Sequence, residues 1–140
     1  MTTAAAAMAL AGCSSGPPPY EPGPGNLVAG TAQTTVNGQN AGTTDAVQCN
    51  TLGTLTIIKT GDDASGVTAL VSNKTELTAE SVAIRDLGGF TGSYNAGLGD
   101  DTANVGMTGR TYDINGTAEG FDTDNPSFRN SGTFAIKVSC

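Results

Sequence analysis

The sequence predicts an all-β fold, a small antiparallel β-sandwich of about eight or nine short strands, and three observations support this prediction. The chain has 20 Gly and only 14% charged residues, and Thr, Ser and Asn are frequent. Gly and Asn accept the positive φ of tight turns, and Thr favours the pleated sheet. Apolar residues recur at every second position, and turn-forming residues interrupt them every 8–12 residues or so, which is typical of a sandwich or a barrel.

Residues 1–12 are predicted to be a signal peptide. An apolar run of small residues begins at Ala4 and ends in Leu10-Ala11-Gly12-Cys13, which matches the bacterial lipobox. Small residues let the backbone enter the signal peptidase, and the Cys13 thiol accepts a diacylglyceryl group. The run is short and no Lys or Arg precedes it, although a signal peptide normally starts with a positive region. We therefore expect the true translation start to lie upstream of Met1. The alternative is an Ala-rich tail with a chance cysteine.

Residues 13–26 are predicted to form a lipidated, disordered tether. Five of the six prolines lie between Pro17 and Pro24, and proline fixes φ and lacks a backbone donor, which favours an extended chain. At about 3.1 Å per residue, the tether holds the domain up to about 40 Å from the anchor. The alternative is a ligand for a proline-binding domain, but the position directly after Cys13 favours a spacer. We expect no cofactor beyond the diacylglycerol and fatty acyl groups on Cys13.

Residues 27–140 are predicted to form the β-sandwich domain. Apolar residues that share the core-facing parity are, in chain order, Val47 and Cys49; Leu55 and Ile57; Val82 and Ile84; Phe90 and Tyr94; Ala103, Val105 and Met107; Tyr112, Ile114, Gly116, Ala118 and Gly120; and Phe134, Ile136, Val138 and Cys140. Turn signals between them are Asn37-Gly38, Gly61-Asp62-Asp63, Gly88-Gly89, residues 97–101 and Asp124-Asn125-Pro126. Residues 62–70 alternatively hold one helical turn.

Cys49 and Cys140 are predicted to form a disulfide. With Cys13 assigned to lipid, they are the remaining even pair in an exported chain. They lie 91 positions apart, and the chain-entropy model gives about 4–5 kcal/mol for a loop of that order. Aromatic residues make up only 5% of the chain, so the core is thin and the crosslink matters. A redox-active pair is the alternative, but such pairs are usually close in sequence beside a positive charge.

The composition argues against an enzyme and against a nucleic-acid partner. The net charge is −7 and the six Lys and Arg residues are scattered, whereas phosphate binding needs clustered cations. The chain has no His, which removes the usual general base, the His-activated nucleophiles and the commonest transition-metal ligand. Asp122, Asp124 and Asn125 offer oxygen ligands of the kind that Ca²⁺ prefers, but such residues are also ordinary turn formers. We expect a solvated turn there, with a calcium site as the alternative.

Three segments of the domain resemble the mycobacterial nineteen-kilodalton lipoprotein antigen (LpqH) family. They are Ala46-Val47-Gln48-Cys49, the block Arg110-Thr111-Tyr112-Asp113-Ile114-Asn115-Gly116-Thr117-Ala118-Glu119-Gly120, and the ending Phe134-Ala135-Ile136-Lys137-Val138-Ser139-Cys140. The resemblance runs from Asp45 to Cys140. It implies a cell-envelope lipoprotein, known as a surface antigen and as a lipid-dependent agonist of innate immune receptors, without catalytic activity. The family linker is usually rich in Thr and Ser and mannosylated, whereas this one is rich in Pro.

Two function classes follow. The first is an interaction domain or surface antigen anchored on the extracytoplasmic face of the cell membrane, whose partners are the membrane and host receptors that sense its acyl anchor. The alternative is a small envelope carrier or sensor that holds an apolar ligand between its sheets. A domain of about 110 residues needs most of its apolar side chains to close the core. A continuous internal cavity of several hundred Å³ would favour the carrier.

Overall fold

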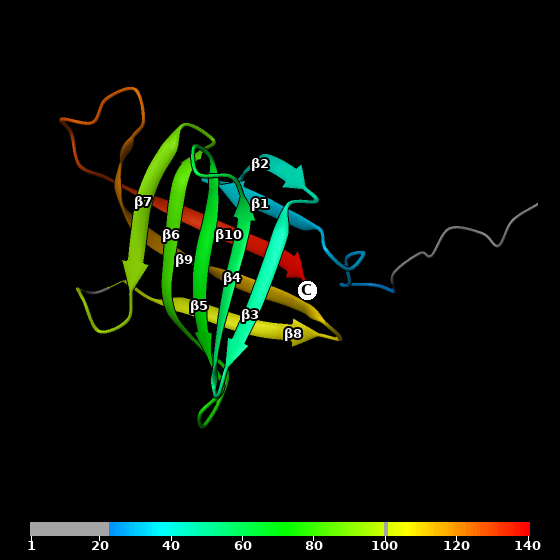
Figure 1. The fold of residues 1–140 in the computed structure, drawn as a ribbon. Coiled ribbons are helices and arrows are strands. Elements are labelled where there is room, and N and C mark those ends of the chain that lie inside the picture. Colours follow the sequence, from blue (N-terminus) through cyan, green and yellow to red (C-terminus); the bar gives the residue numbers. More distant parts are fainter. Residues whose placement is uncertain (1–22, 100) are drawn as a thin grey trace, which may run out of the picture.

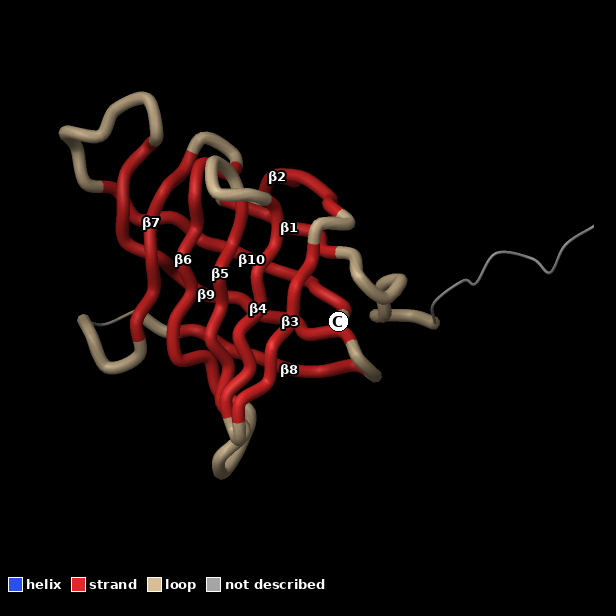
Figure 2. Tube along the Cα trace, viewed as in Figure 1, coloured by secondary structure: helices blue, strands red, loops and turns tan. Residues whose placement is uncertain are grey.

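The computed structural model describes residues 23–99 and 101–140, which form ten β-strands (Figures 1 and 2). The strands are β1 (Ala32–Val36), β2 (Gln39–Thr44), β3 (Val47–Leu52), β4 (Leu55–Gly61), β5 (Gly66–Ser72), β6 (Thr78–Leu87), β7 (Phe90–Asn95), β8 (Ala103–Thr108), β9 (Thr111–Asp122) and β10 (Asn130–Ser139). Among these residues, none belongs to a helix with the length and hydropathy that a membrane span requires.

The strands form one antiparallel sheet that folds over to make two layers. The strand order is β2-β1-β10-β9-β7-β6-β5-β4-β3, and β8 pairs with β9 outside this path. Strands β3 to β7 form one layer, and β1, β2, β10, β8 and most of β9 form the other, which crosses it at a large angle (Figure 1). The antiparallel all-β prediction is confirmed. The two layers belong to a single, nearly closed, barrel-like sheet, and the ladder ends at β2 and at β3.

Strand β9 joins the two layers. Its first half pairs with β8, from Thr111↔Thr108 to Gly116↔Ala103. Its second half pairs with β7, from Glu119↔Ser93 to Asp122↔Phe90. Along the other side, β10 pairs with it almost throughout.

Two glycines make this change of partner possible. A Cβ at Gly120 would overlap the Thr91 carbonyl oxygen, and one at Gly116 would lie 2.8 Å from the Ala103 Cα. Glycine in a strand often marks such a close approach of another backbone. The block that resembles the family therefore contains the glycines that let β9 pass from one layer to the other.

The core lies between the layers and is filled by aliphatic side chains, two phenylalanines and one tyrosine. Val82, Ile84, Phe90, Ile114 and Ile136 are each at most 2% exposed. Their positions confirm the core-facing parity predicted for β6, β7, β9 and β10. The Phe90 ring occupies space above Gly132, where a Cβ would lie 3.0 Å from its Cζ atom.

The predicted parity of β4 is wrong. Leu55 is 38% exposed and Ile57 is half-buried, whereas Ile58 is 1% and Thr60 is 3% exposed. The register decides this: Ile58 pairs with the buried Ala69 of β5, so the neighbouring pair of Ile57 with Leu70 points away from the core. Sequence periodicity was ambiguous because two isoleucines follow each other. Met107, also predicted to face the core, is 47% exposed near the end of β8.

The alternative of a helical turn in residues 62–70 is also wrong. Residues from Gly66 onward form β5, and residues 62–65 are a short loop. The Asp62 carboxylate organises this loop by accepting hydrogen bonds from the backbone N–H groups of Ala64 and Ser65, both at 2.9 Å. The predicted turn at Asn37-Gly38 is confirmed, with φ values of 51° and 78°. Positive φ at both central residues suits a two-residue hairpin.

Candidate functional site

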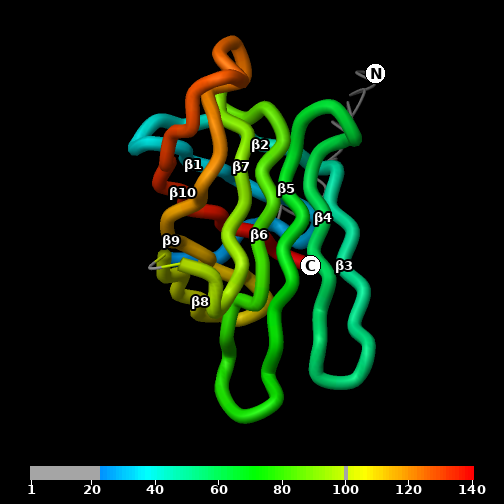
Figure 3. Tube along the Cα trace, turned by 90° about the vertical axis from the view of Figure 1, so that its left-hand side faces the viewer, coloured from blue at the N-terminus to red at the C-terminus, as the bar shows by residue number. Residues whose placement is uncertain are grey.

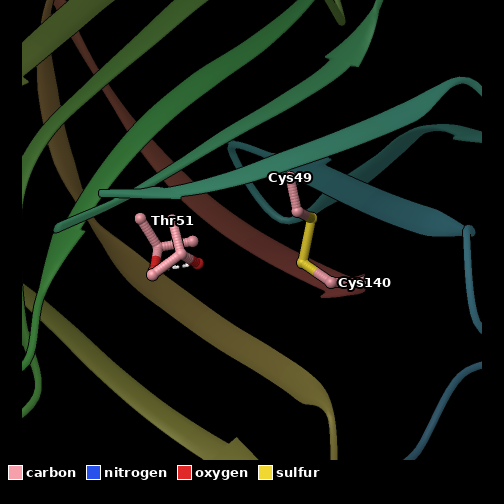
Figure 4. Close-up of a disulfide and its surroundings, with 4 residues drawn as sticks. Cys49, Thr51 and Cys140 are labelled. Carbon is pink, nitrogen blue, oxygen red and sulfur yellow. Dashed lines mark hydrogen bonds between the residues drawn. A yellow bond between two sulfur atoms is a disulfide. The ribbon is translucent and has the colours of Figure 1, made fainter. Parts of the chain in front are cut away.

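The disulfide is the first predicted site that the structure contains. Cys49 of β3 is bonded to Cys140, which directly follows β10, with a Cα–Cα distance of 5.9 Å (Figure 4). Strand β3 ends the hydrogen-bonded ladder, and β10 lies in the opposite layer. The bond therefore ties a free edge of the sheet to the end of the chain.

The prediction that both cysteines face the core holds only for Cys49. Its side chain is half-buried and packs against the core together with Val47. Cys140 is exposed, because the alternation of β10 breaks at its end, where Val138 and Ser139 are both buried. The disulfide is thus a surface crosslink between elements.

The segment that enters the domain is held by backbone groups. The Leu27 N–H donates to the Thr111 hydroxyl at 3.0 Å, and the Gly30 N–H donates to the Ser139 carbonyl at 2.8 Å. Thr111 is fully buried although it lies on the polar parity of its strand. Sequence periodicity missed this role, which only a contact across 84 positions reveals. Cys13, the signal peptide and most of the tether lie outside the described residues.

The acidic loop after β9 is stabilised by its own hydrogen bonds. The Asn125 N–H donates to the Asp122 carbonyl at 2.8 Å, and the Asn130 amide donates to the Asp122 carboxylate at 3.2 Å. Within residues 23–99 and 101–140, no three acidic, His or Cys side chains gather as a metal site. These hydrogen bonds are those of an ordinary turn, in which Asp122 accepts from Asn125 and Asn130.

The surface depressions of the domain are shallow and open to solvent. Five of them have volumes between about 240 and 470 Å³. The depression at the edge of the layer interface, of about 290 Å³, is lined mainly by small and hydroxyl side chains, including Thr34, Thr60 and Ala41. None of these five depressions, all lined by residues that the structure describes, is the enclosed cavity that the carrier alternative needs.

One surface of the domain is apolar without belonging to the core. Leu52 and Leu55 flank the turn between β3 and β4 as a cross-strand pair, and Ile57 pairs with Leu70 on the same outer face. Leu52 is 70% exposed and Leu55 38%, and the other two are half-buried. We call these four residues the tip patch. In the sequence, the two-residue turn Gly53-Thr54 between two leucines could have indicated that apolar residues lie at the tip of this hairpin.

Comparison with known proteins finds mycobacterial lipoproteins that are similar to this chain. Residues 25–140 match the family model described as "Mycobacterium 19 kDa lipoprotein antigen". A putative lipoprotein of Mycobacterium indicus pranii is 38% identical over 132 residues, which is 94% of this chain and 88% of the relative. A putative lipoprotein of Mycobacterium avium subsp. hominissuis is 35% identical over 100% of this chain and 92% of its own length. Lipoprotein LpqH of Mycobacterium tuberculosis is 30% identical over 75% of this chain and 66% of its own length.

The family model covers all ten strands, both disulfide cysteines and the glycine-containing block of β9. These are the features that connect the two layers and close the sheet. The chain belongs to the Mycobacterium 19 kDa lipoprotein antigen family.

Proposed function

We propose that this chain is an exported lipoprotein, anchored in the cell envelope by acyl groups on Cys13, with the β-domain on the extracytoplasmic face. The observation that carries the proposal is the combination of the lipobox Leu10-Ala11-Gly12-Cys13 with a folded domain of a lipoprotein antigen family. The similarity to the putative lipoprotein of Mycobacterium avium subsp. hominissuis extends over the whole chain, the N-terminal segment included.

The domain acts as a surface antigen and a contact module, without catalysis. Its chain lacks His, and the depression at the edge of the layer interface is open and lined mainly by hydroxyl and small side chains. Host innate immune receptors sense the acyl anchor and not the folded surface. Burial of acyl carbons contributes about 0.8 kcal/mol per CH₂, so two or three acyl chains exceed what a polar sheet surface offers to a receptor.

The variant Cys13→Ala tests both parts of the proposal. It cannot accept the diacylglyceryl group, so we expect the protein to move from the membrane fraction to the medium. Mass spectrometry of the wild-type protein should show the acyl mass on Cys13. Purified Cys13→Ala protein, free of other bacterial agonists, should be nearly silent towards immune cells at a concentration at which the acylated protein is active.

Two results would contradict the proposal. A Cys13→Ala protein that still resists aqueous extraction from membranes would refute the anchor. Equal potency of the acylated and unacylated proteins would place recognition on the folded surface instead. Cys49 and Cys140 should remain linked in the variant, which controls for misfolding.

A further inference from the structure

We propose that the tip patch, formed by Leu52, Leu55, Ile57 and Leu70, docks on the surface of the lipid bilayer to which the chain is anchored. This inference rests on the proposed lipidation of Cys13. It assigns an orientation to the domain: the end that carries the β3–β4 and β5–β6 turns faces the lipid, and the opposite end faces outward.

The patch is a contiguous apolar surface that folding does not explain. Leu52 pairs with Leu55 and Ile57 with Leu70, and directly opposed residues on one face of an antiparallel pair are in side-chain contact. Their strands already present a second set of apolar residues, such as Ile58 and Val71, to the core. An apolar cluster on the outer face therefore marks an interaction surface.

The shape of this end suits a bilayer. The β3–β4 and β5–β6 hairpins project from the body of the domain as two neighbouring fingers (Figure 3). Leu52 and Leu55 lie at the tip of the first finger, beside Thr51 and Thr54. Interfacial segments bury an apolar face about 5–10 Å into the boundary of headgroups and acyl chains.

The charges near the patch point to apolar insertion as the driving force. The turn of the second finger carries one cation, Lys74, and one anion, Glu76. Lys59 follows Ile57 on the outer face of β4, where it pairs with Thr68. This mixed set gives no strong preference for anionic lipid, so docking should occur on zwitterionic and anionic bilayers alike.

A second copy of the chain fits the patch less well than lipid does. Stable protein interfaces bury about 800 Å² per partner, and four side chains, two of them half-buried, cover only a part of that area. The covalent anchor favours docking on lipid over self-association, because it keeps the bilayer at a high effective concentration near the tip patch. A domain of this size has a radius of gyration of about 13 Å, and the tether length expected from the sequence, up to about 40 Å, is enough for the fingers to reach the lipid.

The absence of Trp from the chain allows a direct test. The acylated full chain with Leu52→Trp is reconstituted into phosphatidylethanolamine–phosphatidylglycerol vesicles with or without brominated acyl chains. Phe128→Trp is the matched control: Phe128 is 72% exposed, against 70% for Leu52, and lies in the loop between β9 and β10 at the other end of the molecule (Figures 1 and 3). Brominated lipid should quench the indole at position 52 about twofold or more, because burial at this depth brings it near the acyl chains.

The indole of the Phe128→Trp control should keep its emission. In the Leu52→Trp protein, the added substitutions Leu55→Ser and Ile57→Ser should reduce the quenching to the control level. Three outcomes would overturn the orientation: an unquenched Leu52→Trp protein that is retained on the vesicles by its acyl groups, equal quenching of both variants, or a dimer in sedimentation that buries the indole. Mass spectrometry of the same sample measures acylation, and so distinguishes a failure of the lipid anchor from a failure of the proposed orientation. A chain without acyl groups refutes both the anchor and the anchored orientation, whereas an acylated but unquenched chain refutes the orientation alone.

Discussion

Gly116 and Gly120 of β9 occupy positions where a neighbouring backbone fills the space of a side chain. The neighbour is β8 at Gly116 and β7 at Gly120. Each glycine lies beside the strand that pairs with its half of β9. The backbone of that strand leaves no room for a side chain at the glycine. The cost of a larger residue follows from overpacking, which typically amounts to about 1–3 kcal/mol and sometimes more.

Gly120→Ala is therefore expected to lower the free energy of unfolding by about 1–3 kcal/mol or more, because β7 must move away from β9. Gly106→Ala is the control, since Gly106 has an ordinary φ and no heavy atom within 4 Å of its ideal Cβ. We expect a change within about 0.5 kcal/mol there. Urea unfolding of both variants measures the difference, and equal stability of the two would contradict the close approach of β7.

Among the elements, β3 is an edge strand that a covalent crosslink stabilises. It pairs only with β4 and ends the ladder, whereas β10 is paired on both sides. Edge strands present unpaired backbone groups and are prone to pairing with other chains. The disulfide holds this edge against the end of β10, with Cys49 half-buried against the core and Cys140 exposed.

Cys140→Ser should lower the free energy of unfolding by about 2–5 kcal/mol. The exposed position of Cys140 means that the loss reports the crosslink and not a cavity. Reduction of the wild-type protein should produce a similar loss, and reduction of Cys140→Ser should change nothing further. Non-reducing peptide mapping verifies the link in the wild type. A variant as stable as the oxidised wild type would show that packing alone holds β3.

At the scale of the whole molecule, stability depends on packing and the crosslink and hardly on ion pairs. Among the residues that the structure describes, one salt bridge is found, between the Lys137 Nζ and an Asp113 carboxylate oxygen at 3.9 Å. Both side chains are partly exposed, and exposed pairs contribute about 0–1 kcal/mol. The net charge of −7 adds a diffuse repulsion that salt screens.

Lys137→Met should accordingly change the free energy of unfolding by no more than about 0.5 kcal/mol. Phe90→Ala is the contrasting variant, expected to cost about 3–5 kcal/mol because it empties the space above Gly132. Raising NaCl from low to molar concentration should leave the thermal midpoint of the wild type equal or slightly higher. A midpoint that falls clearly with salt would mean that attractive ion pairs dominate.

Local patterns in the sequence were enough to predict the all-β class, the disulfide partners and the core-facing parity of β6, β7, β9 and β10. These features are encoded locally, by alternation, by turn residues such as Asn37-Gly38 and by cysteine count. Periodicity states which residues share a face, but it does not state which face another layer covers. That Ile58 faces the core, and not Ile57, follows from the packing of the two layers and could not be read from the periodicity.

The arrangement of the strands in two layers could not be predicted from the sequence, because it depends on pairing between distant segments. Ala32 pairs with Val138, and β9 contacts β8, β7 and β10 in turn, so contacts between distant segments fold one sheet into two layers. No local pattern specifies that arrangement, since each strand alone would pair equally well in a flat sheet. The tip patch has the same origin: its leucines resemble core residues in the sequence, and the registers of β3 with β4 and of β4 with β5 turn them outward.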